Sequence, residues 1–212
     1  MHPILVVNCK TYEQASGKNL TSFLKKLESL KYPDLYVAVD ALDLKSVAKT
    51  KLKLLIQHID PVSYGQFTGK IVPEEAKKDG AYGALINHAE DRLSFPILKK
   101  NIERAKEAKL KTIVCSASLK EIKKIIPLHP NMIAFEVPSL IGTGKSIAKF
   151  KPKSVQEFVK LLKNTKIIPL CGAGVSTKED VESALKLGTK GVLIASAIVL
   201  AENPVKKIKE FL

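Results

Sequence analysis

The stretch Ile4-Leu5-Val6-Val7-Asn8-Cys9-Lys10 contains the pattern that decides the fold, a short run of apolar residues that ends in polar ones. Apolar residues in sequence without alternation predict a strand buried on both faces, as in a parallel sheet. Similar runs recur at Leu35–Val39, Leu52–Ile56, Ala84–Ile86, Thr112–Cys115, Met132–Phe135, Ile167–Leu170 and Val192–Ile194. The chain is therefore expected to contain eight parallel strands.

The segments between these runs are long enough for crossover helices and show helical spacing. Apolar residues recur at helical intervals in three of them, at Leu20, Phe23, Leu24 and Leu27, at Ile102, Ala105 and Ala108, and at Val155, Phe158, Val159 and Leu162. Eight strand–helix units in 212 residues predict an α/β protein, a closed (β/α)8 barrel that forms a single domain over residues 1–212. A flavodoxin-like open sheet is the alternative, but it normally uses fewer strands.

The lysine-rich composition bears on the expected partners. The formal net charge is +14, and the positive residues are 33 lysines and only two arginines, Arg92 and Arg104, in a chain without tryptophan. A nucleic-acid reader would be expected to use arginine for bidentate contacts and aromatic rings for stacking. The scattered lysines therefore indicate solvated helix faces and no nucleic-acid partner.

The length of the apolar runs and the cysteine pattern indicate where in the cell the protein is expected. No apolar run approaches the length of a membrane span, so no membrane association is expected. Cys9, Cys115 and Cys171 form no CxxC pair and follow or end apolar runs, which favours buried core thiols over a disulfide framework or a zinc site. We expect a cytoplasmic protein.

Polar residues follow the first and fourth runs, where the active site of such a barrel forms. Asn8 and Lys10 point to the same side of their strand, and the lysine can hold an anion; a surface lysine is the alternative. Asn87 is expected to cap a short helical turn that places His88 at its positive end, which favours a neutral imidazole. A structural histidine is the alternative. Glu90 is expected to pair with Lys10.

Glu136 follows the sixth run, where a partly desolvated carboxylate can act as a general base. Behind it, residues 137–144 combine a proline, two glycines and the apolar pair Leu140-Ile141, which we expect to be exposed, as in a mobile lid. Gly144-Lys145-Ser146 is not a P-loop, because Ser139 stands where the first glycine is required. ATP binding is excluded on that ground.

Small residues follow the last two runs, in Cys171-Gly172-Ala173-Gly174 and Ala195-Ser196-Ala197. They let backbone N–H groups approach a phosphate, and a helix that starts there adds its dipole. Tight turns are the alternative explanation for the glycines. The dinucleotide fingerprint fails, because Thr177 stands where its third glycine is required.

The resulting set is one base, one neutral histidine, one cation and a phosphate cup, without a cluster of metal-ligand character. It favours isomerisation of a small phosphorylated carbonyl compound by proton transfer through an enediolate, with no metal or organic cofactor. One rival is a sugar-phosphate epimerase, whose relatives place metal-binding His and Asp residues at strand ends, where this sequence does not show them. The other is a non-enzymatic barrel, either a decayed isomerase or a nucleic-acid binder. The joint presence of Lys10, His88 and Glu136 disfavours decay.

At these same positions the chain resembles the triosephosphate isomerases, particularly the short archaeal type, nearly from end to end. The matching segments are Asn8–Tyr12, the loop from Gln57-His58 through Gln66–Gly69, Asn87–Glu90, Glu136–Gly144, Cys171–Gly174 and Ala195-Ser196.

The resemblance implies that glyceraldehyde 3-phosphate and dihydroxyacetone phosphate are interconverted. Lys10 would then bind the charge of the substrate and steady the enediolate, with Asn8 supporting it. His88 would polarise the carbonyl and shuttle protons between the oxygens, and Glu136 would carry the proton between the two carbons. The remaining substrate contacts would be Ile141 of the lid and the backbone N–H groups of Gly142, Gly174, Ala195 and Ser196.

Three residues depart from the family pattern, since Ala89 replaces a serine, Val137 a proline and Ala197 a glycine. None of them removes a group that does chemistry. The resemblance also implies self-association as a homodimer or homotetramer, through the loop around Gln66–Gly69.

Overall fold

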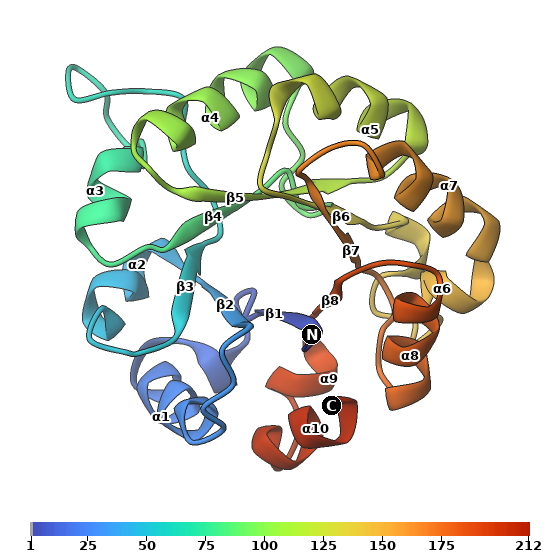
Figure 1. Ribbon diagram of the computed structural model, residues 1–212. Coiled ribbons are helices and arrows are strands. Elements are labelled where there is room, and N and C mark those ends of the chain that lie inside the picture. Colours follow the sequence, from blue (N-terminus) through green and yellow to red (C-terminus); the bar gives the residue numbers. More distant parts are fainter. Residues whose placement is uncertain (1) are drawn as a thin grey trace.

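Eight parallel strands form a closed barrel in which each strand pairs with its neighbours in the chain and the first pairs with the last (Figure 1). The computed structural model describes residues 2–212. The strands are β1 (Ile4–Asn8), β2 (Leu35–Val39), β3 (Lys53–Ile56), β4 (Gly83–Ile86), β5 (Lys111–Ser116), β6 (Met132–Phe135), β7 (Ile168–Cys171) and β8 (Gly191–Ile194). Every predicted run is a strand, and no boundary is displaced by more than one residue, so the predicted TIM-barrel architecture is confirmed.

Helices surround this barrel on the outside (Figure 1). The α-helices are α1 (Gly17–Glu28), α2 (Ala41–Leu44), α3 (Pro73–Lys78), α4 (Phe95–Glu107), α5 (Leu119–Ile125), α6 (Ile147–Phe150), α7 (Pro152–Leu162), α8 (Lys178–Lys186), α9 (Ser196–Val199) and α10 (Pro204–Phe211). Short 3-10 helices are η1 (Glu13–Ala15), η2 (Lys45–Val47), η3 (Ile126–Leu128) and η4 (Pro138–Leu140). No helix within residues 2–212 is both long and apolar enough to span a bilayer.

The core has two layers, which follow from the two-residue period of the strands. In β1, Val6 points into the barrel, whereas Leu5 and Val7 pack outward against the helices. The apolar residues with helical spacing belong to the outer layer of the core, and Val159, half-buried, packs against it. The alternation places Asn8, the last residue of β1, on the inner side, and a left-handed turn then brings Lys10 to the mouth of the barrel.

Glycine begins two of the strands because the backbones approach closely there. A Cβ atom at Gly83 would lie 2.3 Å from the carbonyl oxygen of Lys111, and one at Gly191 would lie 2.0 Å from that of Ile4. Neither contact is possible for a residue with a side chain. These glycines therefore permit the pairing of β4 with β5 and of β8 with β1.

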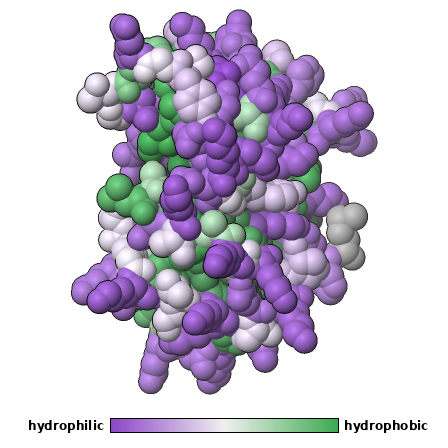
Figure 2. Space-filling model, turned by 90° about the vertical axis from the view of Figure 1, so that its left-hand side faces the viewer, coloured by the Kyte–Doolittle hydropathy of each residue, from purple (hydrophilic) through white to green (hydrophobic). Residues whose placement is uncertain are grey.

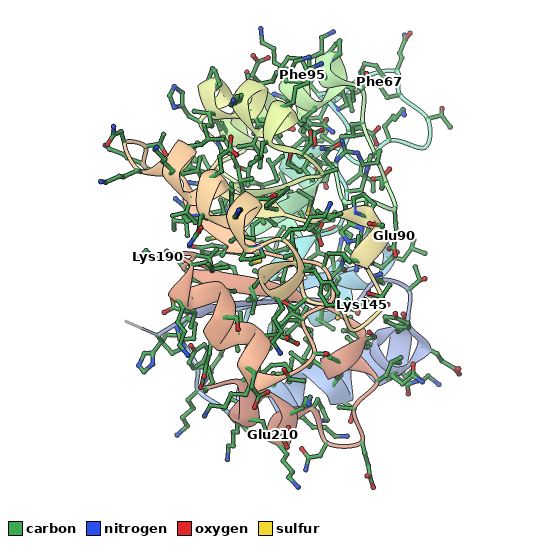
Figure 3. The ribbon with its side chains drawn as sticks, turned by 90° about the vertical axis from the view of Figure 1, so that its right-hand side faces the viewer. Phe67, Glu90, Phe95, Lys145, Lys190 and Glu210 are labelled. Atoms are coloured by element: carbon green, nitrogen blue, oxygen red, sulfur yellow. The ribbon has the colours of Figure 1, made fainter. Side chains whose placement is uncertain are left out.

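The two ends of the barrel differ in chemistry. At the amino ends of the strands, the rings of Tyr36 and Tyr82 meet edge to face at 5.8 Å, and Lys53 Nζ lies 4.8 Å from the centre of the Tyr36 ring. Lys190 lies toward this end, whereas Glu90 and Lys145 lie at the opposite one (Figure 3). Much of the outer surface is hydrophilic, as the side bearing α1 to α3 shows (Figure 2). The catalytic candidates all belong to the carboxyl end.

Candidate active site

A cavity of about 380 Å³ opens at the carboxyl ends of the strands. Its walls come from the segments that follow β1, β4, β6, β7 and β8. All but two of the predicted site residues line it, namely Lys10, His88, Glu136, Ile141, Gly142, Gly174, Ala195 and Ser196. The exceptions are Asn8 and Glu90, which line a smaller adjoining hollow together with Lys10 and His88.

Lys10 is held at the end of β1 from both its backbone and its side chain. Its backbone is left-handed (φ 47°), and its N–H donates to Asn8 Oδ1 at 3.0 Å. Gln57 Nε2 donates to Asn8 Oδ1 at 3.2 Å and to the carbonyl oxygen of Lys10 at 3.1 Å. Lys10 Nζ bonds Glu90 Oε1 at 2.5 Å, so the predicted ion pair is present. Asn8 and Gln57 thus fix the turn that presents the ammonium group.

His88 follows Asn87, whose backbone is left-handed (φ 64°). The predicted helix start at this point is wrong. A single turn, closed by Asp91 N donating to the carbonyl oxygen of His88 at 2.9 Å, precedes the nearest helix, α4, which begins only at Phe95. The Asn87 side chain bonds to β5 instead of capping a helix. A helix dipole therefore does not set the charge of this imidazole.

A hydrogen bond indicates the protonation of His88 instead. The backbone N–H of Glu90 donates to His88 Nδ1 at 3.3 Å, which requires an unprotonated nitrogen there. A neutral ring then carries its proton on Nε2. Nε2 lies 3.8 Å from Glu136 Oε1, so the donor nitrogen and the carboxylate face the same space.

Glu136 is buried, with 3% of its side chain exposed. Its backbone N–H donates to the carbonyl oxygen of Ser116 at 2.9 Å, which fixes the residue just beyond β6. Oε2 has no hydrogen-bond partner among the described residues. One oxygen of Glu136 is therefore free to meet a group in the cavity that it lines.

Two buried thiols and a glycine surround this carboxylate. Burial, then the charge of Glu136, raises the pKa of Cys171 to about 12. The pKa of Cys115 is also raised, by burial and then by the charge and a hydrogen bond of Glu136. At Gly172 a Cβ atom would lie 2.5 Å from Glu136 Cγ. All three cysteines are buried and unpaired, as predicted, and Gly172 leaves the space that the base occupies.

The segment after Glu136 covers one side of the cavity. It contains η4 and two left-handed glycines, Gly142 (φ 73°) and Gly144 (φ 70°). Leu140 and Ile141 are half-buried, so the expectation that they are exposed is wrong. Leu140 packs against the core, whereas Ile141 lines the cavity. The apolar side chains of this lid therefore face the protein.

The loop after β7 and the start of α9, where the sequence predicts a phosphate cup, form another wall of the cavity. A Cβ atom at Gly174 would lie 2.1 Å from the carbonyl oxygen of Lys145, so this loop touches the base of the lid. Asp180 anchors the loop, since its carboxylate accepts from Ser176 N and Thr177 N, each at 3.0 Å. Ala195, Ser196 and Ala197, at the start of α9, line the cavity.

The strand-end geometry therefore combines a buried carboxylate, an imidazole, an ammonium group and two loops of small residues in one cavity. Within residues 2–212, no group of three His, Cys, Asp or Glu residues has the arrangement of a metal site. No sequence pattern marks Gly172 as a space for the base. Gln57 was visible only as part of a matching loop.

Comparison with known proteins identifies relatives along the whole chain. The family model for triosephosphate isomerase matches residues 3–211. The triosephosphate isomerase of Methanothermus fervidus is 37% identical over 216 residues, which cover 99% of this chain and 97% of that protein. The enzymes of that name from Sulfolobus acidocaldarius and Methanocaldococcus jannaschii are 34% and 36% identical, with 99% of this chain covered in each case and 93% and 98% of theirs.

Proposed function

The chain belongs to the triosephosphate isomerase family, and we propose that Lys10, His88 and Glu136 carry out its reaction. The enzyme interconverts glyceraldehyde 3-phosphate and dihydroxyacetone phosphate. The observation that carries the proposal is the convergence of these three side chains on one cavity, beside a cup of backbone N–H groups.

Proton transfer begins at Glu136. Its carboxylate removes a proton from the carbon next to the carbonyl group, and the electron pair moves to the carbonyl oxygen, which gives an enediolate. The same carboxyl group then returns the proton to the neighbouring carbon. The atoms of the substrate are rearranged without any net change in oxidation, so the reaction needs no redox cofactor.

His88 and Lys10 act on the oxygens. The Nε2–H group of His88 donates to the carbonyl oxygen as negative charge develops there, and the ring can pass a proton between the two oxygens. The ammonium group of Lys10 stabilises the same charge. Glu90, at 2.5 Å, holds that ammonium group toward the cavity.

The phosphate group of the substrate would bind to the N–H groups of Gly142, Gly174, Ala195 and Ser196. Ala197 carries a Cβ atom where the family has glycine, next to these contacts. The lid, with Ile141 against the substrate, would exclude water from the enediolate.

A coupled assay with glyceraldehyde 3-phosphate, with phosphoglycolate as a competitor, tests this assignment. Lys10→Ala and Glu136→Asp should each lower kcat/KM by at least about 100-fold, because each removes or displaces a charge at the reacting atoms. Lys190→Ala, at the opposite end of the barrel (Figure 3), removes the same charge as Lys10→Ala and serves as its control. Equal activity of the two lysine variants would contradict the proposed roles.

We also propose that the enzyme is at least a homodimer. The loop that follows β3 projects beyond the helices (Figure 1), and its aromatic residues Tyr64 and Phe67 are 54% and 51% exposed. Light scattering should give a mass at least twice the chain mass of 23.2 kDa, and a monomeric mass would contradict the proposal.

The three cysteines are unpaired, which fits a reducing compartment. We therefore propose a location in the cytoplasm, which cell fractionation can test.

A further inference from the structure

Behind His88, outside the cavity, lies a polar network centred on Glu121 of α5. We propose that Glu121 is a positioning residue, which holds the turn that presents His88 to the substrate through Asn87 and Arg92. This inference rests on the proposed function, because it assumes that His88 acts on the substrate.

Each carboxylate oxygen of Glu121 accepts two hydrogen bonds, and the two oxygens bond different segments. Oε1 accepts from Arg92 Nη2 and, at 3.2 Å, from Asn87 Nδ2. Oε2 accepts from Ser116 Oγ at 2.8 Å and from Ala117 N at 2.9 Å. One carboxylate therefore joins the segment after β4 to the end of β5.

Asn87 has a left-handed backbone (φ 64°), a conformation that asparagine adopts when its side chain finds hydrogen-bond partners. Asn87 Nδ2 also donates to the carbonyl oxygen of Cys115 at 2.9 Å, and Asn87 Oδ1 accepts from Leu93 N at 3.0 Å. Arg92 Nη1 donates to the carbonyl oxygen of Asn87 at 3.3 Å. With Glu121, these bonds fix both the backbone and the side chain of the residue that precedes His88.

The same network reaches the base. Ser116, which donates to Glu121 through its side chain, accepts the backbone N–H of Glu136 at 2.9 Å through its carbonyl oxygen. The two residues that face each other at 3.8 Å, His88 and Glu136, are thus tied to the same end of β5. A shift of Glu121 is expected to change their separation.

A purely local helix-capping role does not account for these contacts. Glu121 is the third residue of α5, whose N-cap is Ser118, and in a capping box it would bond the backbone N–H of Ser118. It accepts from Ala117 and from the segment after β4 instead. Burial would raise the pKa of Glu121, but hydrogen bonds from Ala117, Ser116 and Arg92 outweigh that effect and lower it, so the carboxylate is charged at neutral pH.

Glu121→Gln is the variant that tests this role. An amide has one acceptor oxygen, so donors on one side of the network lose their partner while the shape is kept. We expect kcat to fall by about 10- to 100-fold, the range for misplacement of a reacting group by up to about 1 Å. KM for dihydroxyacetone phosphate should change less than about twofold, because the phosphate cup and Lys10 lie on other strands. Glu182→Gln removes the same charge from the exposed face of α8 and should leave kcat unchanged.

The Glu121→Gln substitution made in a His88→Gln protein distinguishes a positioning role of Glu121 from a general loss of structure. In a His88→Gln protein, Glu121→Gln should cause a smaller loss of kcat than in the wild type, since one of the two groups whose separation it sets is already gone. Arg92→Lys keeps the charge but cannot hold both Asn87 and Glu121, and it should behave in the same way. If Glu121→Gln does not fold, Arg92→Lys serves as the test of the positioning role.

Two results would overturn the inference. One is a kcat within twofold of the wild type for Glu121→Gln, or for Arg92→Lys if Glu121→Gln does not fold. The other is a loss of equal size in the His88→Gln background. If His88→Gln itself had wild-type activity, the proposed function would fail instead, which keeps the two failures distinguishable.

Discussion

The contact between Gly172 and Glu136 allows a sharp test of where the base must sit. An alanine at position 172 would place its Cβ atom 2.5 Å from Glu136 Cγ and 2.7 Å from Oε1. To restore an ordinary contact of 3.4 Å, Cγ has to retreat by about 0.9 Å. The φ angle of Gly172 lies outside the left-handed range, so alanine itself causes no backbone strain there.

Displacement of a reacting group by about 1 Å lowers a rate by about 100-fold, or roughly 2.7 kcal/mol in the activation barrier. We therefore expect Gly172→Ala to lower kcat by about that factor in the coupled isomerase assay. KM and the inhibition constant of inorganic phosphate should change little, because the N–H groups of Gly174, Ala195 and Ser196 are untouched. Crowding in the core should also lower the free energy of unfolding, by about 1 to 3 kcal/mol.

Glu136→Ala supplies the control for this prediction. It removes the Cγ atom that the new methyl group would meet, so Gly172→Ala should cost no stability in that background. A kcat for Gly172→Ala within threefold of the wild type would refute the reasoning, as would an equal loss of stability with and without the Glu136 side chain. Either result would mean that the base does not react from the position described above.

Three further predictions concern other parts of the chain. Asp180→Asn should weaken the anchor of the phosphate loop and raise the KM for the triose phosphate, with Lys149 Nζ, now 2.7 Å from Asp180 Oδ1, left unpaired. Burial would raise the pKa of Asp180, but hydrogen bonds from Lys149, Ser176 and Thr177 outweigh that effect and hold it below 3.8. The stabilisation of the folded state by ionised Asp180 is therefore complete above the unfolded pKa and is lost as the pH falls through the folded pKa. Denaturant titrations between about pH 5 and 2 should show a smaller fall in the free energy of unfolding for Asp180→Asn than for the wild type. Finally, the buried thiols Cys9, Cys115 and Cys171 should not react with a thiol reagent in the native protein, and all should react in guanidinium, whereas rapid native reaction would contradict their burial.

The strands and the places of Lys10, His88 and Glu136 could be predicted because both follow from short-range patterns, whereas the contact of Ile141 followed only from the family resemblance. Runs such as Met132–Phe135 are too apolar for any exposed position, and the end of a parallel strand gives Glu136 its place directly. The turn at His88 could not be predicted in this way. Asn87 has the sequence character of a helix cap, but its side chain finds partners on β5 and at Leu93, which lie outside any local window.

The residues that sequence reasoning missed share this dependence on neighbours across strands. Gly172 was assigned to the phosphate cup, yet its missing side chain matters for a carboxylate that follows a different strand. Glu121 is an ordinary acidic residue in the first turn of a helix until the ends of β4 and β5 come together. Such roles need the register of the barrel, because that register decides which side chains meet.

At the mouth of the barrel, residues with left-handed backbones lie at or next to the proposed catalytic residues and in the loop after β7. Lys10, Asn87 and Ala173 are non-glycine residues with left-handed backbones, at φ 47°, 64° and 64°, and each follows a different strand at the carboxyl end of the barrel. For Lys10 and Ala173 this conformation is expected to cost about 1 kcal/mol or more, whereas asparagine adopts it more readily when its side chain is hydrogen-bonded. Lys10 is held by Asn8 and Gln57, and Asn87 by Arg92 and Glu121. Because the turn at Lys10 aims the ammonium group and the turn at Asn87 aims the imidazole, the side chains that relieve this strain also set the distances over which protons and charge must move.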